Sequence, residues 1–352
     1  MYPRNVLPDL QIRKAVPLAP FTTFGIGGAA RYFTEAKTDE EIVQAVFWAN
    51  ERGLPLFVLG GGSNLLVRDS GFAGLVLKIA VMGVQACGGD LFDVGAGESW
   101  DRFVEMMMYL GMAGVECLAG IPGSVGGTPV QNVGAYGQEV AETIESVRAF
   151  DRETFEWVDL DKAACRFRYR ESLFNTDEPG RYIVTRVRFR LRANGQPNLR
   201  YADLQRRFAG RGDVTLMEVA TAVREIRRSK GMLLVEGDAD CRSAGSFFKN
   251  PIVATERLAG VAAAIGVEQS KVPHWPAGEG KIKIPAAWLL EQAGFVKGYG
   301  EGPARISTRH TLALTNRGGA TFADVERLQD EIVRGVRERF GITLEREPVL
   351  VG

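Results

Sequence analysis

The sequence has few residues of the types that hold metals or form disulfides. Only two histidines, His274 and His310, occur in 352 residues. The four cysteines are far apart and none belongs to a CxxC pair: Cys87, Cys117, Cys165 and Cys241. A multi-histidine metal centre is therefore excluded, and the cysteine spacing fits neither a disulfide framework nor a zinc site. Chemistry in this chain must rely on other side chains or on a bound cofactor.

The sequence also lacks a net charge and long apolar runs. Lys plus Arg and Asp plus Glu each number 43, whereas a basic excess is typical of proteins that bind nucleic acid or membrane surfaces. The N-terminal stretch MYPRNVLPDLQIRK has no apolar core of a signal peptide, and no window resembles a transmembrane helix. We therefore expect a cytoplasmic protein without nucleic-acid or membrane partners, and with no bound metal.

The most unusual stretch is Leu118 to Gly137, LAGIPGSVGGTPVQNVGAYG. It contains six glycines, two prolines and no charged residue, and its polar groups are hydroxyls and amides. Glycines let the backbone turn and let another molecule approach closely, and successive main-chain N–H groups can bind an anion. The prolines and amides argue against a membrane span. We favour a cradle for a large polar ligand, with an uncharged packing loop as the alternative.

A second glycine-rich turn, Gly60 to Asn64 (GGGSN), lies between two short apolar runs, Leu56 to Leu59 and Leu65 to Val67. A strand followed by such a turn is suited to contacting phosphate through backbone amides. It is neither a P-loop nor a GxGxxG fingerprint, and a glycine-rich hairpin would have the same sequence. The functional interpretation gains weight from the second glycine-rich segment.

Periodicity predicts a mixture of helices and strands. Helices are expected to begin at Thr38, Thr215 and Thr321, each an N-cap residue, and Gly341 should end the last one. The β-rich part begins near Ser146, and residues 194–197 (NGQP) are the best domain boundary. A final strand is expected from Ile342 to Val351, with Glu345 and Glu347 on the same side.

Two rows of alternating arginines predict half-buried strands. In the first row Arg166, Arg168 and Arg170 alternate with aromatic residues, and in the second arginines 186–192 alternate with Val187, Phe189 and Leu191. We interpret the second row as a solvated sheet face. Arg170 differs, because it is expected at a strand end, where a buried arginine could serve as a fixed positive charge.

Six segments, in this order along the chain, resemble one family: GGGSN (60–64), IPGSVGGTPVQNVGAYG (121–137), YRESLF (169–174), AGSFFKNP (244–251), ISTRHTLALTN (306–316) and LEREPVLVG (344–352). They are similar to the UDP-N-acetylenolpyruvoylglucosamine reductases (UDP-N-acetylmuramate dehydrogenases), flavoenzymes of bacterial cell-wall precursor synthesis. The resemblance extends from about Phe21 to the C-terminus. Its second and fourth segments are highly specific.

The resemblance implies an α+β fold. An FAD-binding module of the vanillyl-alcohol-oxidase (PCMH) type is expected in residues 1–195, as two α+β subdomains at about 1–70 and 71–195. A C-terminal α+β domain for the UDP-sugar is expected in residues 196–352. The resemblance also implies a monomer with non-covalent FAD, NADPH as co-substrate, and UDP-N-acetylglucosamine enolpyruvate as the substrate.

The implied reaction makes UDP-N-acetylmuramate. NADPH reduces FAD, flavin N5 gives hydride to the enolpyruvyl group, and the resulting enolate-like species is protonated. By motif, Ser246 would donate the proton, and Arg170 would stabilise the carboxylate and the developing enolate. Glu347 would assist the enolate-like intermediate from its other side. Glu345 is the alternative to Glu347.

The resemblance also assigns binding residues. The FAD contacts are expected at Gly60, Gly61, Gly62, Ser63, Asn64, Ile121, Pro122, Gly123, Ser124, Gly126, Gly127, Thr128, Asn132, Gly134 and Ile183. The substrate contacts are expected at Tyr201, Lys230, Asn250, Lys297 and His310. Tyr201 matches a tyrosine that covers the substrate and marks the long form of the enzyme. The alternatives are a surface lysine or a core tyrosine, and the long acidic loop 231–242 departs from the family pattern.

Two other functions remain open. One is another FAD-dependent oxidoreductase of the same fold, which would attach its flavin through His or Cys, yet the first half of the chain has no His. The other is a non-catalytic UDP-sugar-binding protein, against which the presence of Arg170, Ser246 and Glu347 argues.

Overall fold

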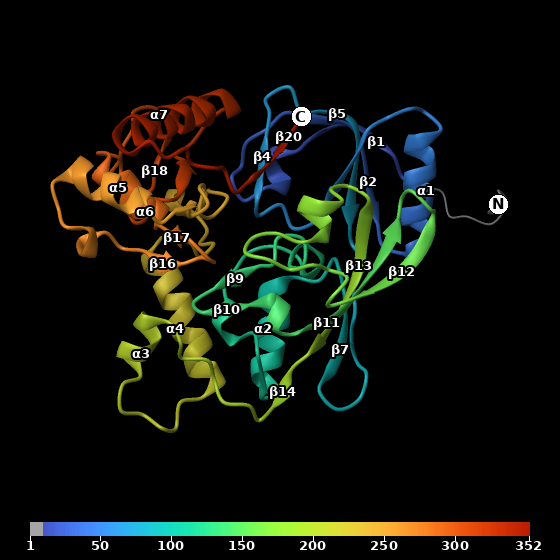
Figure 1. Cartoon of the computed structure of the whole chain (residues 1–352). Coiled ribbons are helices and arrows are strands. Elements are labelled where there is room, and N and C mark those ends of the chain that lie inside the picture. Colours follow the sequence, from blue (N-terminus) through green and yellow to red (C-terminus); the bar gives the residue numbers. More distant parts are fainter. Residues whose placement is uncertain (1–9) are drawn as a thin grey trace. The chain divides into compact units, whose positions relative to one another are not determined.

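The computed structural model describes residues 10–352, which fold into two units (Figure 1). The first contains residues up to Val16, Ala30–Gly62 and Phe72–Arg228; the second contains Pro17–Ala29, Ser63–Gly71 and Ser229–Gly352. Residues 1–9, most of the N-terminal stretch considered above, lie outside the described residues. The units part at residue 228, whereas the expected cofactor and substrate domains part at residue 195. That functional division stays a prediction, because the units are defined by packing alone.

The first unit contains a four-stranded sheet. Across this sheet the strands are β1 (Arg13–Pro17), β2 (Ala29–Ala36), β5 (Phe72–Ile79) and β3 (Leu56–Leu59). Strand β5 pairs in parallel with both β2 and β3, and helix α1 (Asp39–Asn50) connects β2 to β3. The predicted cap is confirmed, since the Thr38 side chain accepts a hydrogen bond from the Glu41 amide.

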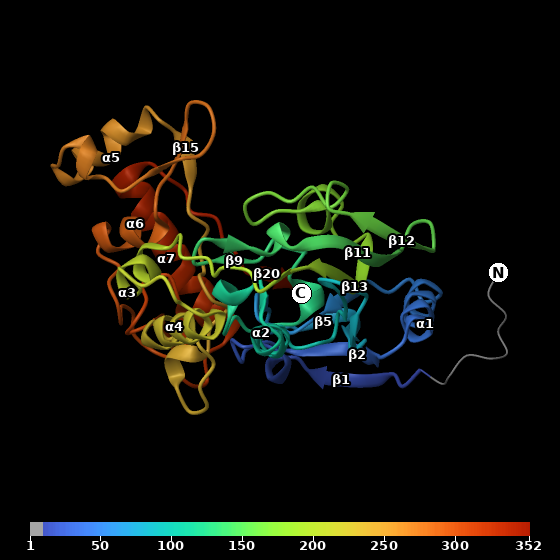
Figure 2. The same ribbon diagram turned by 90° about the horizontal axis from the view of Figure 1, so that it is seen from below.

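A five-stranded sheet forms another layer of this unit (Figure 2). Its order is β12 (Glu156–Asp161), β11 (Ile144–Asp151), β13 (Tyr182–Arg190), β7 (Leu91–Gly95) and β6 (Val84–Ala86), and all neighbours are antiparallel. Arg186 and Arg188 lie 3.5 and 2.8 Å from the Asp93 carboxylate. The second arginine row is therefore confirmed as a strand as far as Arg190, and Asp93 on the neighbouring strand β7 pairs with its polar face.

Shorter elements complete the first unit. They are α2 (Trp100–Tyr109), α3 (Ala202–Arg207), α4 (Leu216–Ser229), the pair β8 (Met112–Ala113) and β14 (Arg192–Ala193), and the pair β9 (Gly134–Ala135) and β10 (Gln138–Glu139). The predicted N-cap of α4 is confirmed and forms a capping box: the Thr215 hydroxyl accepts from the Glu218 amide at 3.2 Å, and the Glu218 carboxylate accepts from the Thr215 amide at 2.9 Å.

The second unit combines three small sheets with three helices. The sheets are β15 (Ile252–Ala254) with β17 (Lys281–Lys283) and β16 (Trp275–Pro276), β18 (Ala304–Ile306) with β19 (Leu314–Asn316), and β4 (Leu65–Val67) with β20 (Val349–Val351). Helices α5 (Arg257–Ile265), α6 (Ala286–Gln292) and α7 (Phe322–Phe340) gather in the part drawn orange to red in Figure 1. Among residues 10–352, no helix has both the length and the apolar character needed to cross a membrane.

Helix α7 begins and ends where the sequence predicts. The Thr321 hydroxyl caps the helix by accepting from the Asp324 amide. The Asp69 carboxylate accepts from the Phe322 amide at 2.8 Å, which places negative charge at the helix N-terminus. Gly341 ends the helix with φ +66°. One face of the helix is apolar and buried: Val325, Leu328, Ile332, Val336 and Phe340.

The predicted strand through Arg166 to Arg170 is wrong. Arg166 and Arg170 have φ values of +48° and +61°, which a pleated strand does not contain. Arg168 and Glu171 exchange main-chain hydrogen bonds in a tight turn, and the Arg168 side chain lies 2.7 Å from Asp177. Local hydrogen bonds and ion pairs thus override the alternating pattern, and Arg170 lies in a turn.

The predicted final strand is also too long. Regular pairing is confined to β20, and upstream only an isolated bridge joins Phe248 to Arg346. Pro348 has no N–H, and the chain changes partner there, from residues 247–249 to β4. Glu345 and Glu347 therefore share no continuous strand, and they differ in burial: the Glu345 side chain is 77% exposed and Glu347 is half-buried.

Trp100 connects this fold to the long glycine-rich loop. It is 1% exposed at the start of α2, and its indole N–H donates to the Leu118 carbonyl at 3.0 Å. Leu118 is completely buried, so water cannot replace this donor. The first residue of the glycine-rich stretch is thus held by the core.

We expect Trp100→Phe to lower the free energy of unfolding by about 1–3 kcal/mol, the cost of removing the donor from a buried acceptor. Urea unfolding followed by far-UV circular dichroism measures it. The control is Trp275→Phe at an exposed position, which should change stability by less than about 0.5 kcal/mol. Equal losses in the two variants would contradict the anchoring role of Trp100.

Candidate functional site

The two glycine-rich turns meet in the first unit. A Cβ atom placed on Gly61 would lie 2.5 Å from the Gly123 Cα and 2.6 Å from the Ser124 nitrogen. A Cβ on Gly60 would lie 2.8 Å from the Ser124 Oγ. Contacts this close exclude any side chain larger than hydrogen at Gly61. The backbone of the first turn therefore lies directly against the backbone of the second.

Main-chain hydrogen bonds to residues 96–100 fix the turn at Gly123 to Gly126. The Val125 amide donates to the Glu98 carbonyl, the Gly126 amide to the Ala96 carbonyl, and the Trp100 amide to the Gly123 carbonyl, at 2.9 to 3.1 Å. Among the main-chain bonds recorded for residues 10–352, none is donated by the amides of Gly61, Gly62, Gly123 or Ser124. These four N–H groups can donate to a ligand, as in anion-binding nests.

Ser124 adds a buried hydroxyl to this arrangement. The residue is 7% exposed, and its Oγ has no hydrogen-bond partner in the part of the chain that the structure describes. A buried polar atom without a partner costs about 1–3 kcal/mol, so such atoms are commonly completed by water or a ligand. The residues present fit a cofactor with anionic oxygens, such as the pyrophosphate of FAD. The Thr128 hydroxyl, by contrast, donates to the Val125 carbonyl at 2.8 Å.

Asn132 holds the loop to the arginine-bearing turn. It is buried with φ +44°, and its amide nitrogen donates to the Glu139 carboxylate at 2.9 Å and to the Arg168 carbonyl at 3.0 Å. Its amide oxygen accepts from the Ala141 N–H. Both the nitrogen and the oxygen of the carboxamide are thus hydrogen-bonded within the protein. The expected contact of Asn132 with a cofactor stays a prediction.

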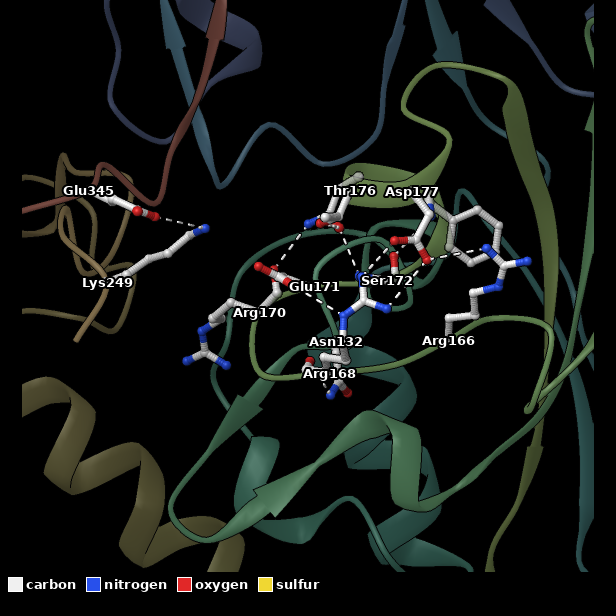
Figure 3. A network of polar contacts seen from close by, with 12 residues as sticks. Asn132, Arg166, Arg168, Arg170, Glu171, Ser172, Thr176, Asp177, Lys249 and Glu345 are labelled. Atoms are coloured by element: carbon white, nitrogen blue, oxygen red, sulfur yellow. Dashed lines mark hydrogen bonds and ion pairs between the residues drawn. The ribbon is translucent and has the colours of Figure 1, made fainter. Parts of the chain in front are cut away.

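Arg170 is fixed by the same loop. Its Nη2 donates to the Gly134 carbonyl at 2.8 Å, and the Ser172 hydroxyl donates to the Val130 carbonyl at 2.5 Å. Figure 3 shows the Arg170 guanidinium pointing away from the cluster of Arg168, Glu171 and Asp177. Three side-chain hydrogen bonds, from Asn132, Arg170 and Ser172, thus join the uncharged loop to the turn. The arrangement places one guanidinium beside a neutral backbone.

Tyr201 lies beside this loop. It precedes α3, and its ring packs edge-to-face on Tyr136 with centroids 5.1 Å apart. Burial raises the pKa of Tyr136, although the nearby Arg227 guanidinium opposes the rise. Arg227 is itself buried and donates to the Gly120 carbonyl at 2.9 Å. Ile183, another predicted contact, is completely buried in β13.

The remaining predicted residues belong to the second unit, where Ser63 and Asn64 are linked to two distant segments. The Thr23 hydroxyl donates to the Ser243 carbonyl at 2.7 Å and also approaches the Ser63 carbonyl at 3.3 Å. The Asn64 side-chain Nδ2 donates to the Glu347 main-chain carbonyl at 3.4 Å. The Val349 main-chain amide donates to the Asn64 main-chain carbonyl at 2.9 Å. Asn64, the last residue of the GGGSN turn, is thus hydrogen-bonded to the segment that contains Glu347.

The segments of Ser246 and Glu347 lie side by side. The Glu347 amide donates to the Phe247 carbonyl and the Lys249 amide to the Glu345 carbonyl, both at 2.9 Å. Ser246 and Glu347 are both half-buried. Glu345 is exposed and forms an ion pair with Lys249 at 3.7 Å, as Figure 3 shows. This difference favours Glu347 over Glu345 as the residue that faces a substrate.

The predicted substrate residues have varied surroundings. The Asn250 carboxamide oxygen accepts from the Ala286 amide at 2.9 Å and so caps α6. Lys230 is half-buried directly after α4, and Lys297 is exposed. The His310 amide donates to the Ser307 hydroxyl at 3.3 Å. Their substrate contacts all stay predictions.

The sequence interpretation assigned no role to Thr23 or Trp100. Thr23 bonds to Ser243, 220 residues away, and Trp100 bonds to Leu118 from an ordinary helix start. No local pattern signals either contact.

Two family models match this chain. Residues 30–160 match the family model described as FAD binding domain, and residues 237–351 match that of the UDP-N-acetylenolpyruvoylglucosamine reductase C-terminal domain. The UDP-N-acetylenolpyruvoylglucosamine reductase of Streptomyces coelicolor is 51% identical, with 99% of this chain and 93% of that protein covered. The Thermobifida fusca protein of the same name is 47% identical, with 96% and 97% covered.

A solved structure has the same fold. The crystal structure of the UDP-N-acetylenolpyruvylglucosamine reductase from Thermus caldophilus superimposes with a TM-score of 0.68 at 27% identity, covering 97% of this chain and all of that one. The expected α+β fold, an FAD-binding domain followed by the family's C-terminal domain, is confirmed. Because relatives of about 50% identity match nearly its whole length, this chain belongs to the UDP-N-acetylenolpyruvoylglucosamine reductase family.

Proposed function

We propose that this protein reduces UDP-N-acetylglucosamine enolpyruvate to UDP-N-acetylmuramate in peptidoglycan precursor synthesis, with bound FAD and with NADPH as the reductant. Family membership supports the reaction. The observation that carries the cofactor assignment is the close approach of Gly61 to Gly123, with the partnerless Ser124 hydroxyl beside them.

The first unit would hold the FAD pyrophosphate on uncharged groups. The amides of Gly61, Gly62, Gly123 and Ser124, together with the Ser124 hydroxyl, would donate to its oxygens. When bound, the flavin supplies the hydride chemistry between NADPH and the substrate. Burial raises the pKa of Cys117 at the edge of the loop, so its thiol is a poor nucleophile for covalent attachment of a flavin.

Arg170 would bind the substrate carboxylate and stabilise the negative charge that develops on the enolate. Its guanidinium is held by the Gly134 carbonyl, so little reorganisation is needed when charge appears. Fixed charges and dipoles aimed at developing charge are commonly the largest contribution to catalysis. The neutral loop matters here, because it contributes no carboxylate that would neutralise the arginine.

Ser246 would donate its Oγ proton to the substrate carbon that carries the ether oxygen. A serine hydroxyl is a weak acid, so the transfer depends on how the hydroxyl is placed and on the groups around it. The main-chain bonds that join residues 247–249 to residues 345–347 support such placement, with Glu347 assisting. Tyr201, Lys230, Asn250, Lys297 and His310 would bind the UDP-sugar.

The overall proposal is tested by the absorption spectrum of the purified protein. We expect a non-covalent flavin that NADPH bleaches and that UDP-N-acetylglucosamine enolpyruvate restores under anaerobic conditions. Denaturation with acid should release all of the flavin into the supernatant. The proposal would be refuted if the protein takes up no FAD, or if the substrate does not reoxidise the reduced flavin.

Gly61→Ala should weaken FAD binding at least tenfold, or about 1.4 kcal/mol, because its Cβ would displace the Gly123 backbone. Titration of the apoprotein with FAD, followed by flavin fluorescence, measures the dissociation constant. Gly260→Ala in α5 is the control, since a Cβ there meets nothing within 4 Å. Unchanged affinity in the Gly61 variant would show that the close approach does not shape the cofactor site.

Ser246→Ala should leave flavin reduction by NADPH nearly unchanged and slow reoxidation by substrate about 10²- to 10⁴-fold, the usual contribution of a positioned acid. Stopped-flow absorbance separates the two half-reactions. Ser270→Ala, at an exposed serine, should affect neither. Equal losses in both half-reactions would argue against a proton donor.

A further inference from the structure

A buried carboxylate in the second unit lies close in sequence to Ser246. Asp240 is 6% exposed and belongs to the short helix Ala239–Cys241, within the acidic loop 231–242. None of the roles proposed above uses it. Carboxylates are rarely buried unless they are paired, so its surroundings require an explanation.

The loop carboxylate receives hydrogen bonds from several donors of the β18–β19 hairpin region. The Thr308 amide and hydroxyl donate to it at 3.0 and 2.6 Å, and Arg317 Nη1 donates at 2.7 Å. Arg309 Nε lies 3.3 Å away and also pairs with Asp238. Burial alone would raise the pKa of Asp240, but the bonds from Thr308 and Ser307 and the charge of Arg317 lower it.

These contacts join the loop to the hairpin just ahead of the proposed proton donor. The Asn316 amide donates to the Arg242 carbonyl at 2.9 Å, and the Phe247 amide donates to the Leu312 carbonyl at 2.8 Å. Ser246 lies between these two main-chain attachments. Its neighbour Gly245 has φ +78°, a conformation that glycine adopts readily, so these attachments help to fix a backbone that would otherwise be flexible.

We propose that Asp240 is a positioning residue for Ser246. Its carboxylate fixes the loop against the hairpin through Thr308, Arg309 and Arg317, and this attachment sets where the Ser246 hydroxyl lies. The inference rests on the proposed function, in which Ser246 protonates the substrate. Asp240 takes no part in flavin binding or in the reaction with NADPH.

The charge of Asp240 is the property to test. Asp240→Asn keeps the size of the side chain but replaces one oxygen by an NH₂ group, which cannot accept from the hairpin donors. We expect flavin reduction by NADPH within about twofold of the wild type, and reoxidation by substrate at least tenfold slower, since a misplaced catalytic group can cost about 10²-fold. Stopped-flow absorbance of the holoenzyme measures both.

A double-mutant cycle separates positioning from general destabilisation. In the Ser246→Ala background, Asp240→Asn should slow reoxidation by less than about twofold, because the group it positions is gone. Glu236→Gln is the matched control, since it makes the same charge change at an exposed glutamate of the same loop, and both half-reactions should be unchanged.

Three results would overturn the inference: a wild-type rate for Asp240→Asn, an equal loss in both half-reactions, or an undiminished effect in the Ser246→Ala background. If Asp240→Asn does not fold, Arg317→Gln removes one of the partners and should give the same selective loss in reoxidation. The proposed function is judged separately, by whether the substrate reoxidises the wild-type flavin at all.

Discussion

The proposed cofactor site depends on one constraint, the contact of two backbones at Gly61 and Gly123. A methyl group at Gly61 would overlap main-chain atoms that hydrogen bonds to residues 96–100 hold in place. Because no side chain separates the turns, their N–H groups can converge on one ligand. The loop also has no charged side chain, which suits a buried ligand site, since an unpaired buried charge would be costly.

Charge enters the two units in different ways. In the first unit the guanidinium of Arg170 donates to the Gly134 carbonyl of the uncharged loop, and that of the buried Arg227 donates to the Gly120 carbonyl. In the second unit, main-chain bonds align the segments of Ser246 and Glu347, and the charges of Asp240, Arg309 and Arg317 lie behind them. In the proposed function, the charge of Arg170 would bind the substrate carboxylate, whereas the charges around Asp240 would support the neutral hydroxyl of Ser246.

Local features of the fold could be predicted from the sequence, and long-range ones could not. The caps at Thr215 and Thr321 were correct because they depend on residues three apart. The strand through Arg166 failed because alternation cannot reveal a turn made by positive φ and by the Arg168–Asp177 pair. The contact of Gly61 with Gly123 joins distant segments, so spacing could not show it. Family resemblance supplied candidate roles for residues but no geometry.

Three residues near the proposed cofactor site have a strained backbone, which lowers stability but fixes where their side chains lie. Asn132, Tyr136 and Arg170 all have positive φ, at a cost of about 1–3 kcal/mol each for residues other than glycine. Such conformations persist only where other contacts determine them. Here those contacts are the bonds of Asn132 to Arg168, the packing of Tyr136 on Tyr201, and the bond of Arg170 to Gly134. These three residues lie in the segments where the proposed cofactor and substrate carboxylate would bind.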